Sequence, residues 1–209
     1  MTQIVGVCGL IGSGKNTVAE ILEKEFEFVP VSFASVLKDM CAALFGWDRE
    51  MLEGNTEYGR LKREEVDKWW SDKLQIPGFS PRFALQYIGT DVLRDHFHKN
   101  IWVLAAERNI IKHDRVVISD VRFPNEINMI KSHNGMMMCV TRGPEPDWYK
   151  TALKNPSYMH DIYPNIHYSE YAWIDTKFNS VIDNDATLDV LHAKVCEALR
   201  KHQHTVGVI

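Results

Sequence analysis

The sequence predicts an α/β protein in which helices cover both faces of a parallel sheet, giving three layers (α/β/α). Short apolar runs, typical of strands buried on both faces, alternate along the chain with segments whose apolar residues recur at helical spacing. The first run, residues 4–8, leads through a glycine-rich turn into a helical segment. Because strands that alternate with helices favour parallel pairing, we expect a single domain over residues 1–209.

The first elements follow from local patterns. After the strand at residues 4–8, apolar residues recur every three or four positions over 15–26, which indicates an amphipathic helix. Residues 29–33 form a second apolar run and predict a strand. A helix over 36–45 is expected to end at Gly46, because glycine readily takes the left-handed conformation found at helix ends.

The second half of the chain repeats this alternation. Between residues 81 and 112 we expect two helices, with a proline in the first turn and a break near the Gly-Thr-Asp run at 89–91. The closing helix carries leucine and valine on one side. The remaining expected elements are strands at 116–118, 136–141 and 180–182 and helices at 125–132 and 187–201.

Two segments depart from the strand–helix alternation. Residues 47–80 are dense in charge and contain the pair Trp69-Trp70, which predicts a helical insertion in the core fold. Residues 143–173 are rich in proline, tyrosine and histidine with weak periodicity. We interpret this second segment as a mobile, lid-like loop region.

Composition excludes several classes of protein. A chain of 209 residues, 45% of them hydrophobic, can bury a core and is not mainly disordered. A net charge of −4 argues against general binding to a nucleic acid polymer. No apolar run approaches the roughly 20 residues that span a bilayer, so we expect no membrane association and no signal peptide. The four separated cysteines are interpreted as reduced, buried thiols of a cytoplasmic protein.

The strongest motif lies directly after the first strand. Its G-x-x-x-x-G-K pattern stands between a predicted strand and a predicted helix, which is the context this phosphate-binding motif requires. The glycines let backbone N–H groups turn toward an anion, and the helix N-terminus adds its positive dipole end. The lysine can follow the charge that develops during phosphoryl transfer. We therefore expect ATP to be bound by Gly9, Gly12, Ser13, Gly14, Lys15, Asn16 and Thr17.

A magnesium site is expected beside this loop. Asn16 stands where serine or threonine usually reaches Mg²⁺, so either its amide oxygen or the Thr17 hydroxyl could take that role. Asp120 follows a predicted strand, and ligands of open parallel sheets lie beyond the carboxyl ends of strands. Asp120 could hold Mg²⁺, directly or through water; the alternatives are a helix cap or a structural pair with Arg122.

Several arginines and a tryptophan point to a phosphorylated acceptor. Arg122 shares the edge of the sheet with the phosphate loop and could hold a phosphate. In and near the insertion, Arg60, Arg63 and Arg82 could bind a monophosphate while Trp69 packs against its base. The alternative is that the tryptophans belong to the core and the basic residues form a solvated face.

Arg142 follows the strand predicted at 136–141 and precedes the lid-like segment. An arginine at this place suits a lid that closes over the triphosphate and excludes water. A kinase needs that exclusion, because water would otherwise accept the phosphoryl group.

Over nearly its whole length the chain resembles the phage-type deoxynucleoside monophosphate kinases. The phosphate loop alone is shared by many kinases, whereas the later motifs are more specific. The resemblance rests on Gly9 to Thr17, Phe33-Ala34 through Lys38, Leu52-Glu53-Gly54 to Arg60, Pro81 to Gln86 with Gly89-Thr90-Asp91, Trp102, Asp120 to Glu126, His167 with Ser169-Glu170, and Ile182-Asp183-Asn184.

The resemblance implies a P-loop kinase fold whose helical insertion binds the monophosphate. The implied reaction is MgATP + dNMP → ADP + dNDP, in support of DNA replication. A phosphate monoester with a second pKa of about 6 is already a nucleophile, so no general base is required. The implied residues are Lys15, Arg122 and Arg142 for the transferred phosphoryl group, and Lys38, Arg82, Gln86, Asp91 and Arg122 for the monophosphate.

Two other functions stay open at this point. The same core could phosphorylate another small acceptor, such as dephospho-coenzyme A or phosphomevalonate. The chain could also be a switch or assembly protein that binds ATP without an acceptor. The helices near Trp102 could form a homodimer interface, although no residue pattern requires one. If the resemblance holds, we expect the cytoplasm of an infected host cell as the location.

Overall fold

The structure is a computed structural model that describes residues 2–206. The chain divides into two compact units. One unit combines the chain up to Ser32 with the chain from Glu107 onward, and the other is Phe33–Ala106. The insertion predicted at residues 47–80 lies inside the second unit.

The first unit is built on a five-stranded sheet in which every pairing is parallel, as predicted. The strand that precedes the phosphate loop lies in the middle of the sheet, so the loop emerges between the carboxyl ends of its two neighbours. In register, Gly6 of this strand pairs with Ile118 on one side and Met137 on the other. The strands are β1 (Gln3–Cys8), β2 (Val29–Val31), β3 (Arg115–Ile118), β4 (Met136–Thr141) and β5 (Ser180–Asp183), in the order β2-β3-β1-β4-β5.

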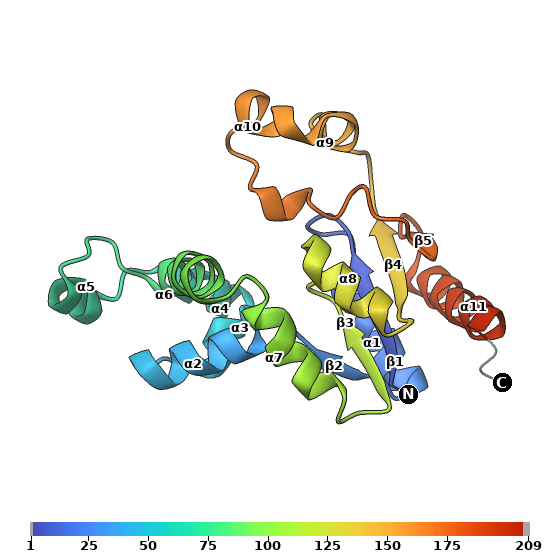
Figure 1. Cartoon of the computed structure of the whole chain (residues 1–209), viewed down its shortest axis with the longest axis horizontal. Helices are drawn as coiled ribbons and strands as arrows, with labels where there is room; N and C mark the ends of the chain where they lie inside the picture. The colour runs from blue at the N-terminus through green and yellow to red at the C-terminus, as the bar shows by residue number, and fades with distance from the viewer. Residues whose placement is uncertain (1, 207–209) are drawn as a thin grey trace. The chain divides into compact units, whose positions relative to one another are not determined.

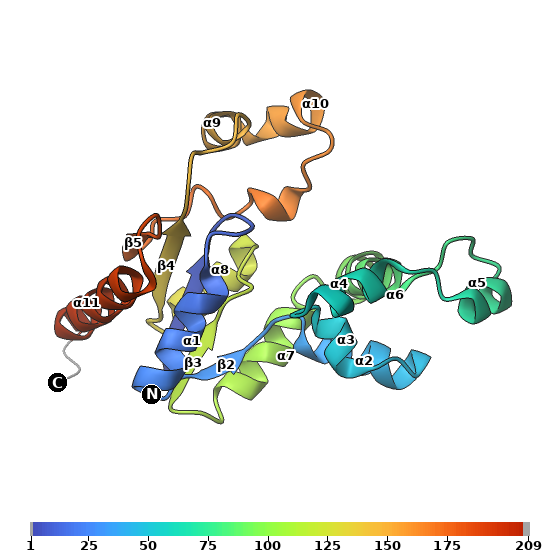
Figure 2. The ribbon, with the colours of Figure 1, turned by 180° about the vertical axis from the view of Figure 1, so that it is seen from behind.

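Helices cover both faces of this sheet, which confirms the three-layer prediction. The helix α8 (Pro124–Ser132) lies on one face, toward the viewer in Figure 1. The helices α1 (Lys15–Phe26) and α11 (Leu188–Val206) cover the opposite face, and α1 is in front in Figure 2. Alternate strand residues point into the core on the α1 side. This core contains Val5, Val7, Val18, Leu22, Phe28, Val117, Met138, Val140, Ile182, Val195 and Leu199.

The segment predicted to be a mobile, lid-like loop region at 143–173 contains short helices and is not a plain loop, while its role as a lid stays a prediction. None of these helices is longer than six residues, which is too short to show a periodic pattern. Buried side chains of Ala152, Met159 and Trp173 hold the segment together. The helices are α9 (Tyr149–Lys154), η2 (Pro156–Tyr158), α10 (Met159–Ile162) and η3 (Tyr168–Glu170).

The second unit is helical. Four of its short helices begin at a serine, threonine or aspartate whose side chain accepts a backbone N–H bond of the first turn. These caps are Asp48, Thr56, Asp67 and Ser80. The helices are α2 (Ser35–Phe45), α3 (Arg49–Glu53), α4 (Glu57–Glu64), α5 (Lys68–Leu74), α6 (Pro81–Gln86), η1 (Tyr87–Phe97) and α7 (Ile101–Ile110), of which α7 continues into the first unit.

Helix α6 does not break near residues 89–91, contrary to the prediction. It continues into η1, a π-helix, which is wider than an α-helix. At its C-terminal end the His98 N–H donates to the Leu93 carbonyl, five residues earlier in the chain. Gly89 fits here because the Leu37 side chain packs against it; a Cβ would lie 2.6 Å from Leu37 Cδ2. Its carbonyl accepts a 2.8 Å hydrogen bond from Trp102 Nε1. Packing of the second unit therefore overrides the local signal of a break.

Trp102 is buried, and its Nε1 is engaged with Gly89. A homodimer through the helices near Trp102 stays a prediction, but the indole itself belongs to the core of the second unit. The four cysteines are free thiols and are buried. Among residues 2–206 we find no helix with the length and apolar character needed to cross a bilayer.

Candidate functional site

The turn between β1 and α1 has the backbone of an open anion site. Gly9, Gly12 and Gly14 all have positive φ angles, and a hydrogen bond from Ser13 N–H to the Leu10 carbonyl (3.2 Å) closes the turn. Gly14 is the N-cap of α1 and has no side chain that could cap the helix. The first N–H groups of α1 are therefore directed out of the helix end, where they can bind phosphate oxygens.

Glycine is required at position 9 on steric grounds. Its φ of 149° is one that other residues rarely adopt, and a Cβ would lie 2.6 Å from Ser13 Oγ and overlap the Val140 carbonyl oxygen. We expect Gly9→Ala to lower the free energy of unfolding by about 3 kcal/mol or more, since strain and overlap add. Urea denaturation followed by circular dichroism measures this loss.

Gly12→Ala is the matched control for this prediction. Gly12 also has a positive φ, 79°, but a Cβ there meets nothing within 4 Å. Only backbone strain of about 1–2 kcal/mol is expected. Equal losses of unfolding free energy in the two variants would show that the close approach of Val140 and Ser13 is not what requires glycine at position 9.

Lys15 lies at the centre of this loop. Its Nζ donates to the Gly9 and Leu10 carbonyls at 2.9 and 2.8 Å, so the side chain folds back over the turn. Burial lowers the pKa of the Lys15 amine, the nearby Arg122 guanidinium lowers it further, and the Glu170 carboxylate opposes both. These electrostatic interactions show that the loop after β3 and the helix η3 approach the phosphate loop.

Asn184 supports the phosphate loop, although sequence reasoning gave it no role in the site. Its Nδ2 donates to the Ser13 carbonyl at 2.8 Å, and a Cβ on Gly14 would overlap that same amide group. The Asn184 backbone N–H donates to the Thr141 carbonyl, which fixes the residue beyond the end of β5. Ser13 itself is buried, and its Oγ has no hydrogen-bond partner among residues 2–206.

The predicted magnesium ligands all lie at this edge of the first unit. Asn16 and Thr17 form the first turn of α1, with Asn16 exposed and Thr17 half-buried. Asp120 follows β3 and accepts a 2.7 Å hydrogen bond from Ser32 Oγ, beyond the end of β2. The alternative role of Asp120 as a helix cap is wrong, because Phe123 is the N-cap of α8. Oxygen donors of these three kinds suit a hard cation such as Mg²⁺.

Arg122 is tied into the first unit by its side chain and its backbone. Its Nη1 donates to Glu170 Oε1 at 2.6 Å and to Ser169 Oγ at 3.4 Å. Its backbone N–H donates to Glu126 Oε2 at 2.7 Å. The alternative pairing of Arg122 with Asp120 does not form; Glu170 takes that place. The Glu170 contact could not be read from sequence, because the two residues are 48 positions apart.

Arg142 directly follows β4, as predicted, and is exposed. Among residues 2–206 its side chain forms no hydrogen bond or ion pair, while the next residue, Gly143, donates its N–H to Asp185 Oδ1 at 2.6 Å. The backbone next to Arg142 is thus held in place, while its exposed guanidinium is available to a ligand.

In the second unit, Lys38 is held by an ion pair. Its Nζ lies 2.6 Å from Glu53 Oε2, and Arg49 Nη1 lies 2.5 Å from the other oxygen of the same carboxylate. Burial would raise the pKa of Glu53, but the hydrogen bonds from Lys38 and Arg49 outweigh burial and lower it. The negative charge of Glu53 therefore holds the Lys38 and Arg49 cations close to each other.

The other residues predicted for the monophosphate differ in exposure. Arg63 is half-buried against Gly54, where a Cβ would lie 2.6 Å from its Nη2, and Arg82 lowers its pKa further after burial does. Arg60 Nη1 donates to the Asn55 carbonyl at 3.2 Å. The exposed members of the set are Arg60, Trp69, Arg82, Gln86 and Asp91, with Trp69 at 59% exposure.

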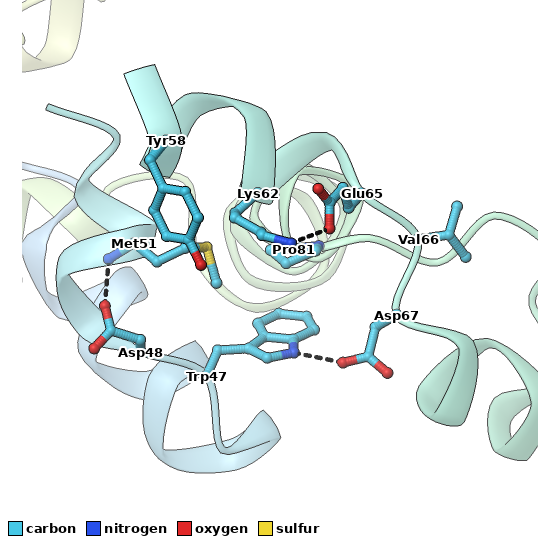
Figure 3. A pocket seen from close by; sticks show the side chains of 9 residues that line it. All are labelled: Trp47, Asp48, Met51, Tyr58, Lys62, Glu65, Val66, Asp67 and Pro81. Carbon is cyan, nitrogen blue, oxygen red and sulfur yellow. Dashed lines mark hydrogen bonds and ion pairs between the residues drawn. The ribbon is translucent and has the colours of Figure 1, made fainter. Parts of the chain in front are cut away.

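The second unit also contains a pocket of about 550 Å³ (Figure 3). Trp47, Met51 and Tyr58 give it an apolar wall, and Lys62 lies over the Tyr58 ring at 5.7 Å. Trp47 Nε1 donates to Asp67 Oδ2 at 2.8 Å, as the dashed line in Figure 3 shows. None of the residues predicted for the monophosphate lines this pocket.

The parallel sheet with a G-x-x-x-x-G-K loop between β1 and α1 defines a P-loop protein. No family model matches the sequence. A protein of Acanthamoeba polyphaga mimivirus, named as a deoxynucleotide monophosphate kinase, is 38% identical over 152 residues, which cover 66% of this chain and 74% of that protein. The deoxynucleoside-5'-monophosphate kinase of Escherichia phage T5 is 26% identical over 194 residues. This match covers 66% of this chain and 75% of the phage protein. The chain belongs to the deoxynucleoside monophosphate kinase family.

Similarity to solved structures extends over 96% of this chain. TT1252 from Thermus thermophilus is 17% identical with a TM-score of 0.46, and dephospho-CoA kinase from Campylobacter jejuni is 15% identical with a TM-score of 0.47. In both comparisons 97% of the solved chain is covered.

Proposed function

We propose that this protein transfers the γ-phosphoryl group of ATP to a deoxynucleoside 5'-monophosphate and releases ADP and the deoxynucleoside diphosphate. The observation that carries the proposal is the phosphate loop with Lys15 folded over it and Arg122 nearby, in a chain of this family. The cytoplasm of an infected host cell stays the predicted location.

On the donor side, the backbone of the loop would cradle the β- and γ-phosphates of ATP. Lys15 would exchange its two carbonyl contacts for phosphate oxygens and follow the charge during transfer. Arg142, free of protein partners among residues 2–206, would close over the triphosphate from the lid-like segment.

Asp120 would hold Mg²⁺ together with either Asn16 or Thr17. An amide oxygen, a hydroxyl and a carboxylate fit the preference of this ion for oxygen donors. When bound, the ion neutralises charge on the β- and γ-phosphates. The Ser32 hydroxyl, which donates to Asp120, would keep that carboxylate oriented.

On the acceptor side, the monophosphate dianion would attack the γ-phosphorus in line. Its second pKa of about 6 leaves it ionised near neutral pH, so the protein needs to position the nucleophile and not to deprotonate it. We assign this positioning to Lys38, Arg60, Arg63, Trp69, Arg82, Gln86, Asp91 and Arg122, on the basis of their chemistry and of the family resemblance.

Arg82→Ala is expected to raise the KM for the monophosphate by about tenfold or more, which corresponds to the loss of a charged hydrogen bond. The KM for ATP should change by less than about twofold, because the substitution removes a contact of only one substrate. Stability should hardly change, since within residues 2–206 the one ion pair of Arg82 is with exposed Glu64 at 3.5 Å. Lys68→Ala, an exposed cation of the same unit, is the matched control. Equal effects on both KM values would remove Arg82 from the acceptor site.

The experiment that tests the function is ADP release from MgATP in the presence of separate dAMP, dGMP, dCMP, dTMP, AMP and dephospho-coenzyme A. Strong stimulation by a deoxynucleotide, with its diphosphate detected by chromatography, would establish the reaction and the range of bases. Stimulation by dephospho-coenzyme A alone would show that this compound, and not a deoxynucleotide, is the acceptor. ATP binding without stimulation by any acceptor would favour the switch function.

A further inference from the structure

The guanidinium of Arg122 is held from one side only. Nη1 makes its two side-chain contacts, with Glu170 Oε1 and Ser169 Oγ, and the side chain is 44% exposed. Among residues 2–206, Nε and Nη2 have no partner. These two nitrogens form the side-on fork that binds two oxygens of a phosphate at once. The contacts to η3 therefore fix the orientation of Arg122 and leave its phosphate-binding edge open.

Ser169 is itself oriented by a second contact within the lid-like segment. Its backbone N–H donates to His167 Nδ1 at 3.2 Å, which makes that ring nitrogen an acceptor. The Ser169 hydroxyl oxygen lies 2.8 Å from the same nitrogen and accepts the 3.4 Å hydrogen bond from Arg122 Nη1. Ser169 is buried, which keeps this arrangement away from competing water.

The backbone of Arg122 is fixed independently of its side chain. Glu126 is 3% exposed, and its Oε2 accepts the backbone N–H groups of Arg122 and Phe123 at 2.7 and 3.0 Å. With the backbone held from α8, the direction of the guanidinium depends on the contacts of Nη1. Glu170 also offsets the repulsion between Arg122 and Lys15, because it opposes the effect of Arg122 on the Lys15 pKa.

We propose that Glu170, assisted by Ser169, is a positioning residue that aims the open edge of Arg122 at a phosphate of the substrates. This inference rests on the proposed function. The competing idea is that Glu170 occupies the phosphate's own place and inhibits the empty enzyme. The free Nε–Nη2 edge argues against competition, since a carboxylate that mimicked phosphate would be expected on that edge.

Kinetics of Glu170→Ala test the proposal. The variant should lower kcat/KM for the monophosphate by about tenfold or more, because a misaligned arginine stabilises the transition state poorly. Glu170→Gln, which still offers an oxygen to Nη1, should recover at least half of the loss on a logarithmic scale. Asp161→Asn removes a charge from the exposed surface of the same segment and should match the wild type.

The double variant shows whether Glu170 acts through Arg122. Adding Glu170→Ala to Arg122→Ala should cause no further loss, because the group being positioned is already gone. Additive losses, unchanged kinetics in Glu170→Ala, or a lower KM for the monophosphate would each overturn the proposal. The last result would establish competition.

A readout without catalysis separates this inference from the proposed function. In ¹⁵N NMR, the guanidinium N–H signals of Arg122 should show hindered rotation in the wild type and in Asp161→Asn, and lose it in Glu170→Ala. If the wild-type enzyme accepts no deoxynucleotide, the proposed function fails while this measurement still decides whether Glu170 orients Arg122. Freely rotating Arg122 in the wild type would overturn the inference alone.

Discussion

Replacing Lys15 by alanine is expected to lower kcat for monophosphate-stimulated ADP release by two or more orders of magnitude. Lys15 is the only side chain of the phosphate loop that brings a full positive charge to it, and it is already desolvated over the turn. Preorganised charge of this kind stabilises a transition state without reorganisation at the moment of reaction. Steady-state kinetics at saturating MgATP measure the effect.

The folded state should survive this change. In the described part of the chain, the Lys15 side chain donates only to two loop carbonyls, and alanine is well tolerated in the first turn of α1. Thermal unfolding of the variant should therefore stay close to that of the wild type. Lys24→Ala, on the same helix but exposed, is the matched control and should be fully active. Near-native rates in Lys15→Ala would remove the phosphate loop from the reaction.

Arg122→Ala is expected to lower kcat/KM for the monophosphate by about 10²–10³-fold, the usual result of removing one preorganised donor from a developing charge. The effect should exceed that of Arg82→Ala, because Arg122 is held by short hydrogen bonds at both backbone and side chain, whereas the ion pair of Arg82 with Glu64 measures 3.5 Å. Kinetics with each substrate varied in turn measure this difference.

Arg115→Ala controls for the loss of an arginine from the same strand region. Arg115 opens β3 at its amino end, and its Nη1 donates to the Phe26 carbonyl, away from the phosphate loop. Its replacement should leave turnover unchanged. If Arg122→Ala lowered the unfolding temperature as well as kcat/KM, the result would indicate a structural role for Arg122 instead.

Local patterns predicted the first unit well. The bounds of α1 and β4 agree with the prediction, because long apolar runs and the glycine turn leave few alternatives. Prediction failed where packing decides. The π-helix η1 passes through Gly89 because Trp102 and Leu37 hold it, and neither contact has a local signature. The helices of the lid-like segment are likewise too short for periodicity to appear.

In the candidate site, too, residues marked by a local sequence pattern were predicted, whereas contacts between distant segments were not. Lys15 and Asp120 were predictable because a motif or a strand end marks them. The partners of these residues were not: Glu170 reaches Arg122 across 48 positions, and Asn184 reaches Ser13 across 171. Such contacts depend on how the sheet brings distant loops to one edge, which requires the whole topology.

The Asn184 contact has a consequence for the newly synthesised chain. The phosphate loop lies between β1 and α1, yet its carbonyl at Ser13 is held by Asn184, which follows β5 and is therefore synthesised after the loop. Chains emerge from the ribosome N-terminus first. The loop therefore gains its full support only after β5 has paired with β4, so the conformation of the phosphate loop matures later than the synthesis of its own motif.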